Sequence, residues 1–126
     1  MPEYLFAYGT LQPGLAPREI ASVVEKLRPM GDGFLFGKLY DRGSYPGAVI
    51  DPASAWVVYG MVYELPEDAG ILDRLDAYEG GEYARIEQIV TLEAGGVLTC
   101  WVYDYLGKPS EDRLIASGRW VERRAP

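Results

Sequence analysis

The spacing of apolar residues predicts two helices, each with one buried face. The first set recurs at three- and four-residue steps: Ile20, Val23, Val24 and Leu27. The second set has the same spacing: Ile71, Leu72, Leu75 and Tyr78. This is the periodicity of an amphipathic helix. We expect Pro17 to lie in the first turn of one helix, and Pro66 to open and Gly80-Gly81 to end the other.

Runs of β-branched and aromatic residues predict strands on both sides of these helices. The runs cover residues 3–8, 33–40, 48–50, 56–63, 83–92 and 97–105. The last two flank a turn at Glu93-Ala94-Gly95-Gly96, which is typical of a hairpin. Residues 110–120 predict only a weak helix or irregular chain. The order of elements indicates an α+β fold. The runs around Trp56 and Trp101 are apolar on both faces, which favours a sheet curled into a barrel with helices outside it.

Length, charge and composition narrow the classes of function. The 126 residues correspond to one domain, 1–126, with enough apolar material for a core. A net charge of -7 argues against nucleic acids and anionic membranes as partners. No apolar run approaches the roughly 18 residues of a membrane span, and no signal pattern opens the chain, so we expect a cytoplasmic protein. The sequence gives no sign of its oligomeric state.

The residue inventory excludes several kinds of catalytic site. The chain has no histidine and only one cysteine, Cys100. Histidine-dependent triads, imidazole zinc sites and iron–sulfur cages are therefore ruled out. Phosphate-binding glycine motifs and calcium-binding loops are also missing from the sequence. We therefore expect no metal and no cofactor, and the remaining chemistry is acid–base catalysis by a carboxylate helped by backbone donors.

Glu79 is the carboxylate best placed for such chemistry. It falls on the last turn of the second predicted helix, where both the helix dipole and any burial raise the pKa of an acid. The alternative is an exposed helix end. Asp76 lies three residues earlier, and we interpret it as a solvated or capping residue. A glycosidase-like carboxylate pair is disfavoured, because the two groups would crowd one helix face.

The first strand ends in Tyr8-Gly9-Thr10-Leu11. A glycine here lets the chain turn sharply, so that successive N–H groups can point into one concavity and bind a carboxylate or an oxyanion. The alternative is a simple turn without a ligand.

Four short motifs in this order resemble the γ-glutamylcyclotransferase-like superfamily, in its small branch of AIG2-like and γ-glutamylamine cyclotransferase members. They are Tyr8-Gly9-Thr10-Leu11, Gly43-Ser44-Tyr45-Pro46-Gly47, Gly60-Met61-Val62-Tyr63-Glu64-Leu65, and Leu75-Asp76-Ala77-Tyr78-Glu79-Gly80 followed by Tyr83 and Arg85. The resemblance covers residues 4 to about 105. The ending Ser117-Gly118-Arg119-Trp120 is similar to that of many members.

The resemblance implies a small mixed, largely closed β-barrel with flanking α-helices. It also implies release of 5-oxoproline from a γ-glutamyl amine or peptide by attack of the α-amine on the side-chain carbonyl. Glu79 would be the general acid and base, and the backbone of Tyr8, Gly9, Thr10 and Leu11 would bind the γ-glutamyl group. Tyr83, Arg85 and Tyr45 would line or support the pocket.

The resemblance leaves two matters open. The leaving amine can be an amino acid, a lysine side chain, glutathione or an antibiotic precursor. A non-catalytic small-molecule binding protein of the same fold is the alternative function, and a purely structural protein is a weaker one.

Overall fold

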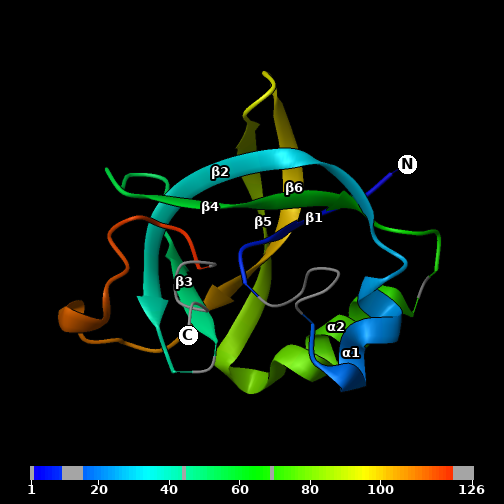
Figure 1. Ribbon diagram of the computed structural model, residues 1–126, viewed down its shortest axis with the longest axis horizontal. Coiled ribbons are helices and arrows are strands. Elements are labelled where there is room, and N and C mark those ends of the chain that lie inside the picture. The colour runs from blue at the N-terminus through cyan, green and yellow to red at the C-terminus, as the bar shows by residue number, and fades with distance from the viewer. Residues whose placement is uncertain (1, 10–15, 44, 69, 121–126) are drawn as a thin grey trace.

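A computed structural model describes residues 2–9, 16–43, 45–68 and 70–120 (Figure 1). In chain order, these residues form β1 (Tyr4–Ala7), α1 (Arg18–Val24), β2 (Arg28–Asp41), β3 (Pro46–Ile50), β4 (Val57–Glu64), α2 (Ile71–Glu79), the 3-10 turn η1 (Gly80–Glu82), β5 (Tyr83–Leu92), β6 (Val97–Tyr105) and the 3-10 turn η2 (Glu111–Arg113).

The sheet closes on itself into a barrel. β1 pairs with β4, β4 with β2, and β2 with β3, all antiparallel. The ring is completed by β6, which runs parallel to β3 on one side and to β1 on the other. β5 is an additional strand that pairs with β6 from Tyr83 to Thr91 and touches β2 at Gly33 and Phe34. The predicted α+β fold with a largely closed barrel is confirmed.

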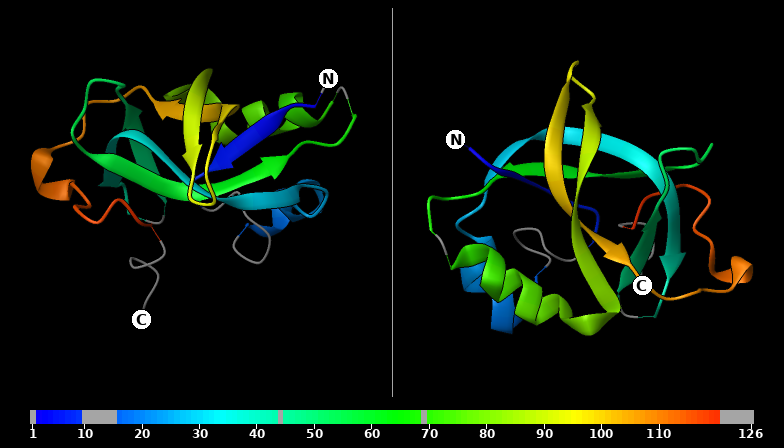
Figure 2. Two further views of the ribbon diagram at one scale, coloured as in Figure 1. Left: turned by 90° about the horizontal axis from the view of Figure 1, so that it is seen from above. Right: turned by 180° about the vertical axis from the view of Figure 1, so that it is seen from behind.

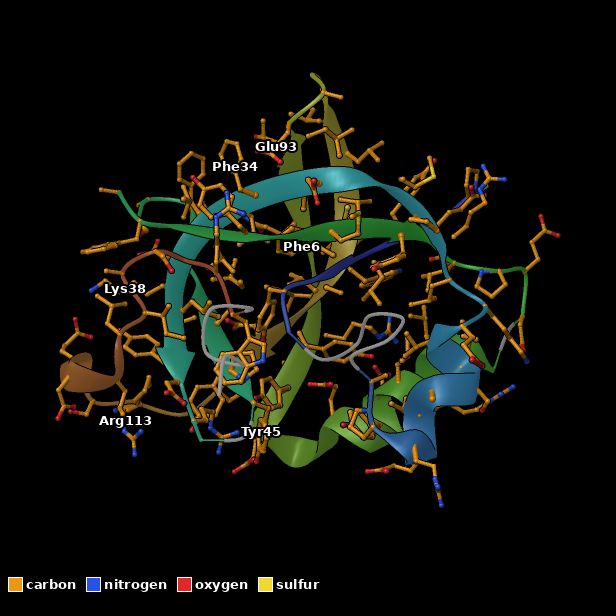
Figure 3. All side chains as sticks on the ribbon, viewed as in Figure 1. Phe6, Phe34, Lys38, Tyr45, Glu93 and Arg113 are labelled. Atoms are coloured by element: carbon orange, nitrogen blue, oxygen red, sulfur yellow. The ribbon has the colours of Figure 1, made fainter. Side chains whose placement is uncertain are left out.

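Alternating residues of the strands fill two separate cores, because successive side chains of a strand point to opposite faces. In β1, Phe6 belongs to the cluster inside the barrel, whereas Leu5 and Ala7 belong to the cluster against the helices. Figure 3 shows Phe6 beside β4, within the ring. Because both faces of β1 are buried, its successive residues are apolar. Trp56 departs from the expectation of two apolar faces, since it precedes β4 and is 40% exposed.

The two helices pack side by side outside the barrel (Figures 1 and 2). Each buries the face predicted from its periodicity, with Ile20, Val23 and Val24 in α1 and Ile71 and Leu75 in α2. Among the described residues, none of the helices is long and apolar enough to cross a membrane.

The bounds of several elements differ from the prediction. α1 begins after Pro17, its N-cap, and ends at Val24, before the predicted Leu27; the differences in α2 and β2 are larger. α2 begins at Ile71 and not at Pro66; ahead of it, the Asp68 side chain accepts a hydrogen bond from the Gly70 N–H at 2.9 Å. β2 begins at Arg28, five residues before the predicted start at Gly33, and a bulge between Pro29 and Gly31 keeps it paired with β4.

Gly80 ends α2 as predicted. Its backbone angles, φ 76° and ψ -171°, lie in a region that essentially only glycine adopts. The chain then makes the single turn η1 and enters β5 directly. The last residue of α2 is therefore held against the barrel by a short, fixed connection.

Candidate active site

A pocket of about 230 Å³ opens between the end of β1, the start of β3, the C-terminal end of α2 and strands β5 and β6. Its walls are mostly aromatic, and the lining residues are Phe6, Ala7, Tyr8, Gly9, Tyr45, Pro46, Tyr78, Glu79, Glu82, Tyr83 and Tyr103. Figure 3 shows Tyr45 beside the junction of α2 and β5. Glu79, Tyr8, Gly9, Tyr45 and Tyr83 were all predicted as site residues, and the fold brings them together here. The predicted site residues Thr10 and Leu11 lie outside the described residues.

Glu79 presents a partly buried carboxyl group to the pocket. Burial raises its pKa from 4.5 to about 7, because a low-dielectric surrounding disfavours the charged form. Within the described part of the chain, no hydrogen bond reaches this carboxyl group. Glu79 is therefore divided between its protonated and ionised forms near neutral pH, the state that suits a group that both accepts and donates a proton.

The end of β1 is fixed against the opposite wall of the pocket. The buried Tyr8 hydroxyl donates a hydrogen bond to the Tyr103 carbonyl at 2.6 Å and accepts one from the Ala48 N–H at 3.3 Å. At Gly9 a Cβ atom would lie 2.7 Å from the Pro46 ring, closer than real Cβ contacts. Glycine thus lets the main chain of residues 8–9 approach β3.

An arginine and its partners form the rim. Arg42 donates two hydrogen bonds to the Glu82 carboxylate, at 3.1 and 3.0 Å, and its guanidinium carbon lies 4.3 Å from the centre of the Tyr105 ring and 5.0 Å from that of Tyr45. Arg42 also donates to the Tyr83 hydroxyl at 3.3 Å. The Tyr83 hydroxyl in turn donates to the Pro46 carbonyl at 2.8 Å. These contacts hold Tyr45 and Tyr83 at the opening.

Arg85 supports the pocket from behind and is not one of its lining residues. It donates two hydrogen bonds to the Asp76 carboxylate, at 2.8 and 3.1 Å, and lies 4.4 Å from the Trp101 ring centre. The Asp76 carboxylate also accepts a hydrogen bond from the Tyr103 hydroxyl at 2.7 Å. Of the interpretation of Asp76 as a solvated or capping residue, the solvated part holds only in part, since its side chain is 39% exposed, and it makes no capping hydrogen bond for α2. Its side chain links α2 to β5 and β6, which the helix periodicity alone does not reveal.

Sequence reasoning missed Arg42, Glu82 and Tyr103. The predicted hairpin joins the strand that carries Arg85 to the strand that carries Tyr103, but its turn would set Arg85 opposite Asp104, whereas β5 and β6 pair Arg85 with Tyr103. Arg42 and Glu82 carry no signal in the sequence, since their contact depends on closure of the barrel. Among the described residues, no group of three aspartate, glutamate or cysteine side chains is arranged to hold a metal ion.

Known proteins share the barrel fold described above. Residues 5–122 match the family described as gamma-glutamyl cyclotransferase, AIG2-like. No curated protein sequence gives a significant match.

Three solved structures show the similarity. The structure of YkqA from Bacillus subtilis has a TM-score of 0.76 and 23% identity over 98% of this chain, which spans only 41% of YkqA. An AIG2-like protein from Mus musculus has a TM-score of 0.73 and 22% identity, covering 94% of this chain and 87% of the mouse chain. Protein ytfP from Escherichia coli is 32% identical, with a TM-score of 0.63 over 97% of this chain and 99% of its own. The chain described here belongs to the AIG2-like gamma-glutamyl cyclotransferase family.

Proposed function

We propose that this protein is a γ-glutamyl cyclotransferase that converts a γ-glutamyl amine or peptide into 5-oxoproline and the free amine, with Glu79 as general acid and base. The observation that carries the proposal is the carboxyl group of Glu79, with a pKa of about 7, in a pocket faced by the end of β1. Membership of the family supports the reaction type.

The proposed reaction needs no protein nucleophile. The α-amine of the γ-glutamyl group attacks the side-chain carbonyl carbon, a new C–N bond closes the five-membered ring, and the original amide C–N bond breaks. Because both reacting groups belong to one molecule, holding them in position can supply effective molarities on the order of 10⁵ to 10⁸ M. The protein has to fold the substrate and carry one proton from the attacking nitrogen to the departing one; the second proton, lost as the α-ammonium becomes the lactam N–H, goes to the freed amine, which leaves as an ammonium.

Glu79 is proposed to move that proton. Its ionised form takes a proton from the α-ammonium, and the resulting carboxylic acid gives the proton to the departing amine. A positioned acid–base group contributes about 10² to 10⁴-fold to the rate. A pKa of about 7 populates both forms at neutral pH. Among the described residues, Glu82 is the other carboxylate that lines this pocket, and it is paired with Arg42.

Binding is proposed to involve both ends of the pocket. The main chain of Tyr8 and Gly9 is assigned to the γ-glutamyl group, and Tyr45 and Tyr83 to the side of the leaving amine. A backbone donor to the developing oxyanion contributes about 10² to 10³-fold. The expected contribution of the Thr10 and Leu11 backbone stays a prediction. Arg85 acts through Asp76 and Tyr103 and is not assigned to the substrate.

The test compares Glu79→Gln with the matched control Glu87→Gln. Glu87 is an exposed residue of β5 outside the pocket. Release of 5-oxoproline is measured by chromatography with a γ-glutamyl amino acid, γ-glutamyl-ε-lysine and glutathione as substrates. We expect Glu79→Gln to lose at least about 100-fold in kcat/KM with its best substrate and Glu87→Gln to keep its activity. Near-normal turnover by Glu79→Gln would refute the role of Glu79.

Thermal shift with the same compounds separates the enzyme from its alternative. An enzyme is stabilised by its substrate and also forms product. If the compounds raise the melting temperature of the unmodified protein and no 5-oxoproline forms, the protein is a non-catalytic binder of the same fold.

A further inference from the structure

A strip of mostly apolar side chains lies on the outside of the barrel. Strand register defines it, because residues directly opposite in an antiparallel pair point to the same face of the sheet. Phe34 of β2 lies opposite Tyr59 of β4 and opposite Thr91 of β5. Thr91 in turn lies opposite Val97 of β6. With the neighbouring positions on the same face, this outer strip consists of Phe34, Phe36, Val57, Tyr59, Ile89, Thr91 and Val97.

The outer strip is contiguous and open to solvent. The Phe34 ring meets the Phe36 ring edge to face and the Tyr59 ring at a tilt, in both cases with 6.0 Å between centroids. Phe36 is 43% exposed, Ile89 61% and Val97 59%. Single exposed apolar residues are normal on a protein surface, whereas a contiguous set marks an interaction site.

The helices cover only one end of this outward face. In β4, Met61 and Tyr63 continue the row of Val57 and Tyr59, because alternate residues of a strand share a face. Both pack in the cluster beneath α1 and α2, whereas Tyr59 does not. The outer strip is thus the uncovered part of a face that the helices bury elsewhere. None of its residues lines the pocket that contains Glu79.

Charges of opposite sign lie at the two ends of the strip. Along β2, the side chains on the outward face are, in order, Asp32, Phe34, Phe36 and Lys38. Glu93 lies beside Asp32, whose carbonyl accepts the Glu93 N–H at 3.0 Å. Figure 3 shows Phe34 and Glu93 outside the ring near the top of the β2 arc, and Lys38 outside it farther along. Asp32 and Glu93 form the acidic end.

Lys38 and Arg119 form the basic end. The guanidinium carbon of Arg119 lies 4.0 Å from the centre of the Tyr59 ring, on the β4 side of the strip. Lys38 contacts Glu111 at 3.2 Å, a pair whose side chains are 36% and 67% exposed. Exposed pairs of this kind hold their partners weakly, so Lys38 remains available to a second carboxylate.

We propose that the outer strip is the contact between two copies of this chain, related by a two-fold axis that crosses the strip between its acidic and basic ends. A two-fold contact uses the same surface on both copies, so each acidic end faces the basic end of the partner. The middle of the strip carries no charge, which lets two molecules of net charge -7 meet there. This dimer is independent of the proposed reaction.

The shape of the strip sets the strength of the contact. It curves with β2 around the barrel (Figure 1), so two copies touch along a narrow band. Interfaces at the small end of the size range are weak. We therefore expect a dissociation constant of about 10 to 100 µM for the dimer.

Sedimentation equilibrium of the purified full chain, from about 5 to 500 µM, measures this constant. The average mass should rise with concentration from 14.0 kDa toward twice that value. Phe36→Asp should raise the dissociation constant at least about 10-fold, because it places a charge in the apolar centre and acts twice in a two-fold contact. Met30→Asp is the control, since Met30 is 41% exposed on the same strand but outside the strip. It should leave the constant within about twofold.

Reversing the charges tests the two-fold arrangement. Asp32→Lys alone puts a base at both ends and should weaken the dimer at least about 5-fold, whereas Asp32→Lys combined with Lys38→Asp exchanges the ends and should restore it. Circular dichroism and thermal melting confirm that each variant is folded. If the double variant unfolds, Arg119→Glu replaces Lys38→Asp.

Four results would overturn the proposal. They are a chain that stays monomeric at about 500 µM, a dimer that Phe36→Asp leaves unchanged, equal weakening by Met30→Asp, and a mass that grows beyond two copies. Failure of the exchanged charges to restore the dimer would refute the two-fold arrangement and the proposal with it. Loss of 5-oxoproline release would not bear on the dimer, because the strip and the pocket share no residue.

Discussion

Replacing Glu79 by glutamine should stabilise the folded protein at neutral and alkaline pH. Burial raises the pKa of Glu79 from 4.5 to about 7 in the folded state, so the native protein binds this proton more tightly than the unfolded chain does. The stability gained from that proton is fully present below about pH 4.5 and is lost as the pH rises through about 7. Glutamine is neutral throughout and never pays the cost of a buried charge.

The magnitude follows from the size of the shift. One pH unit of pKa corresponds to about 1.4 kcal/mol, so the displacement of Glu79 corresponds to about 3 kcal/mol at most. Glu79 keeps some contact with solvent, and we therefore expect about 2 kcal/mol. The free energy of unfolding of Glu79→Gln should equal that of the unmodified protein near pH 4 and exceed it by this amount at pH 8. In melting temperature the difference is about 4 °C per kcal/mol.

Urea unfolding at pH 4, 6 and 8 measures this difference. Glu87→Gln, which removes an exposed carboxylate from β5, is the control and should show almost no change between these pH values. If the advantage of Glu79→Gln is the same at pH 4 and pH 8, or if the variant is less stable at pH 8, then Glu79 is not held in a charge-disfavouring environment. In that case the main observation behind the proposed function is lost.

Three more predictions concern the site and its support. Because ionised Glu79 is the proposed base, kcat/KM for 5-oxoproline release should rise as the pH passes through about 7; a flat profile between about pH 5 and 9 would contradict this. Gly80→Ala should lower the free energy of unfolding by about 1 to 3 kcal/mol because of the backbone angles of Gly80. Gly81→Ala, where a Cβ meets nothing within 4 Å, is the control and should change it by less than about 1 kcal/mol. Equal effects of the two changes in denaturant unfolding would exclude backbone strain at Gly80. Tyr8→Phe leaves a buried N–H and a buried carbonyl without this hydroxyl and should cost about 1 to 3 kcal/mol in thermal unfolding; an unchanged melting temperature would show that water replaces it.

The sequence predicts those parts of the fold that depend on neighbouring residues. The strands expected at residues 83–92 and 97–105 coincide with β5 and β6, because a glycine-rich turn joins two strongly β-forming runs. The buried faces of both helices follow from periodicity. The start of α2 differs from the prediction because Pro66 is a helix-start signal in the sequence, whereas Asp68 bonds the Gly70 N–H just before the helix, which begins at Ile71.

The site residues show the same difference between what local sequence patterns predict and what depends on the folded arrangement. Glu79 is found from sequence because the helix end and its glycine stop are local features, and Gly9 because it follows a strand. The contacts of Asp76 with Tyr103 and of Arg42 with Glu82 join residues 27 and 40 positions apart. The first pair depends on how β6 lies against α2, and the second on how the end of β2 lies against η1, which no local pattern specifies.

The barrel closes at a narrow seam. Strand β6 meets β1 in the single register pair Leu5 and Trp101, and β3 in the single pair Ala48 and Asp104. The pocket lies on this seam, with walls from β1, β3 and β6. A molecule bound in this pocket would contact the strands on both sides of the closure. Tyr8, directly after β1, already links Ala48 of β3 to Tyr103 of β6 through its hydroxyl, so a ligand bound beside it is expected to stabilise the closed ring as well.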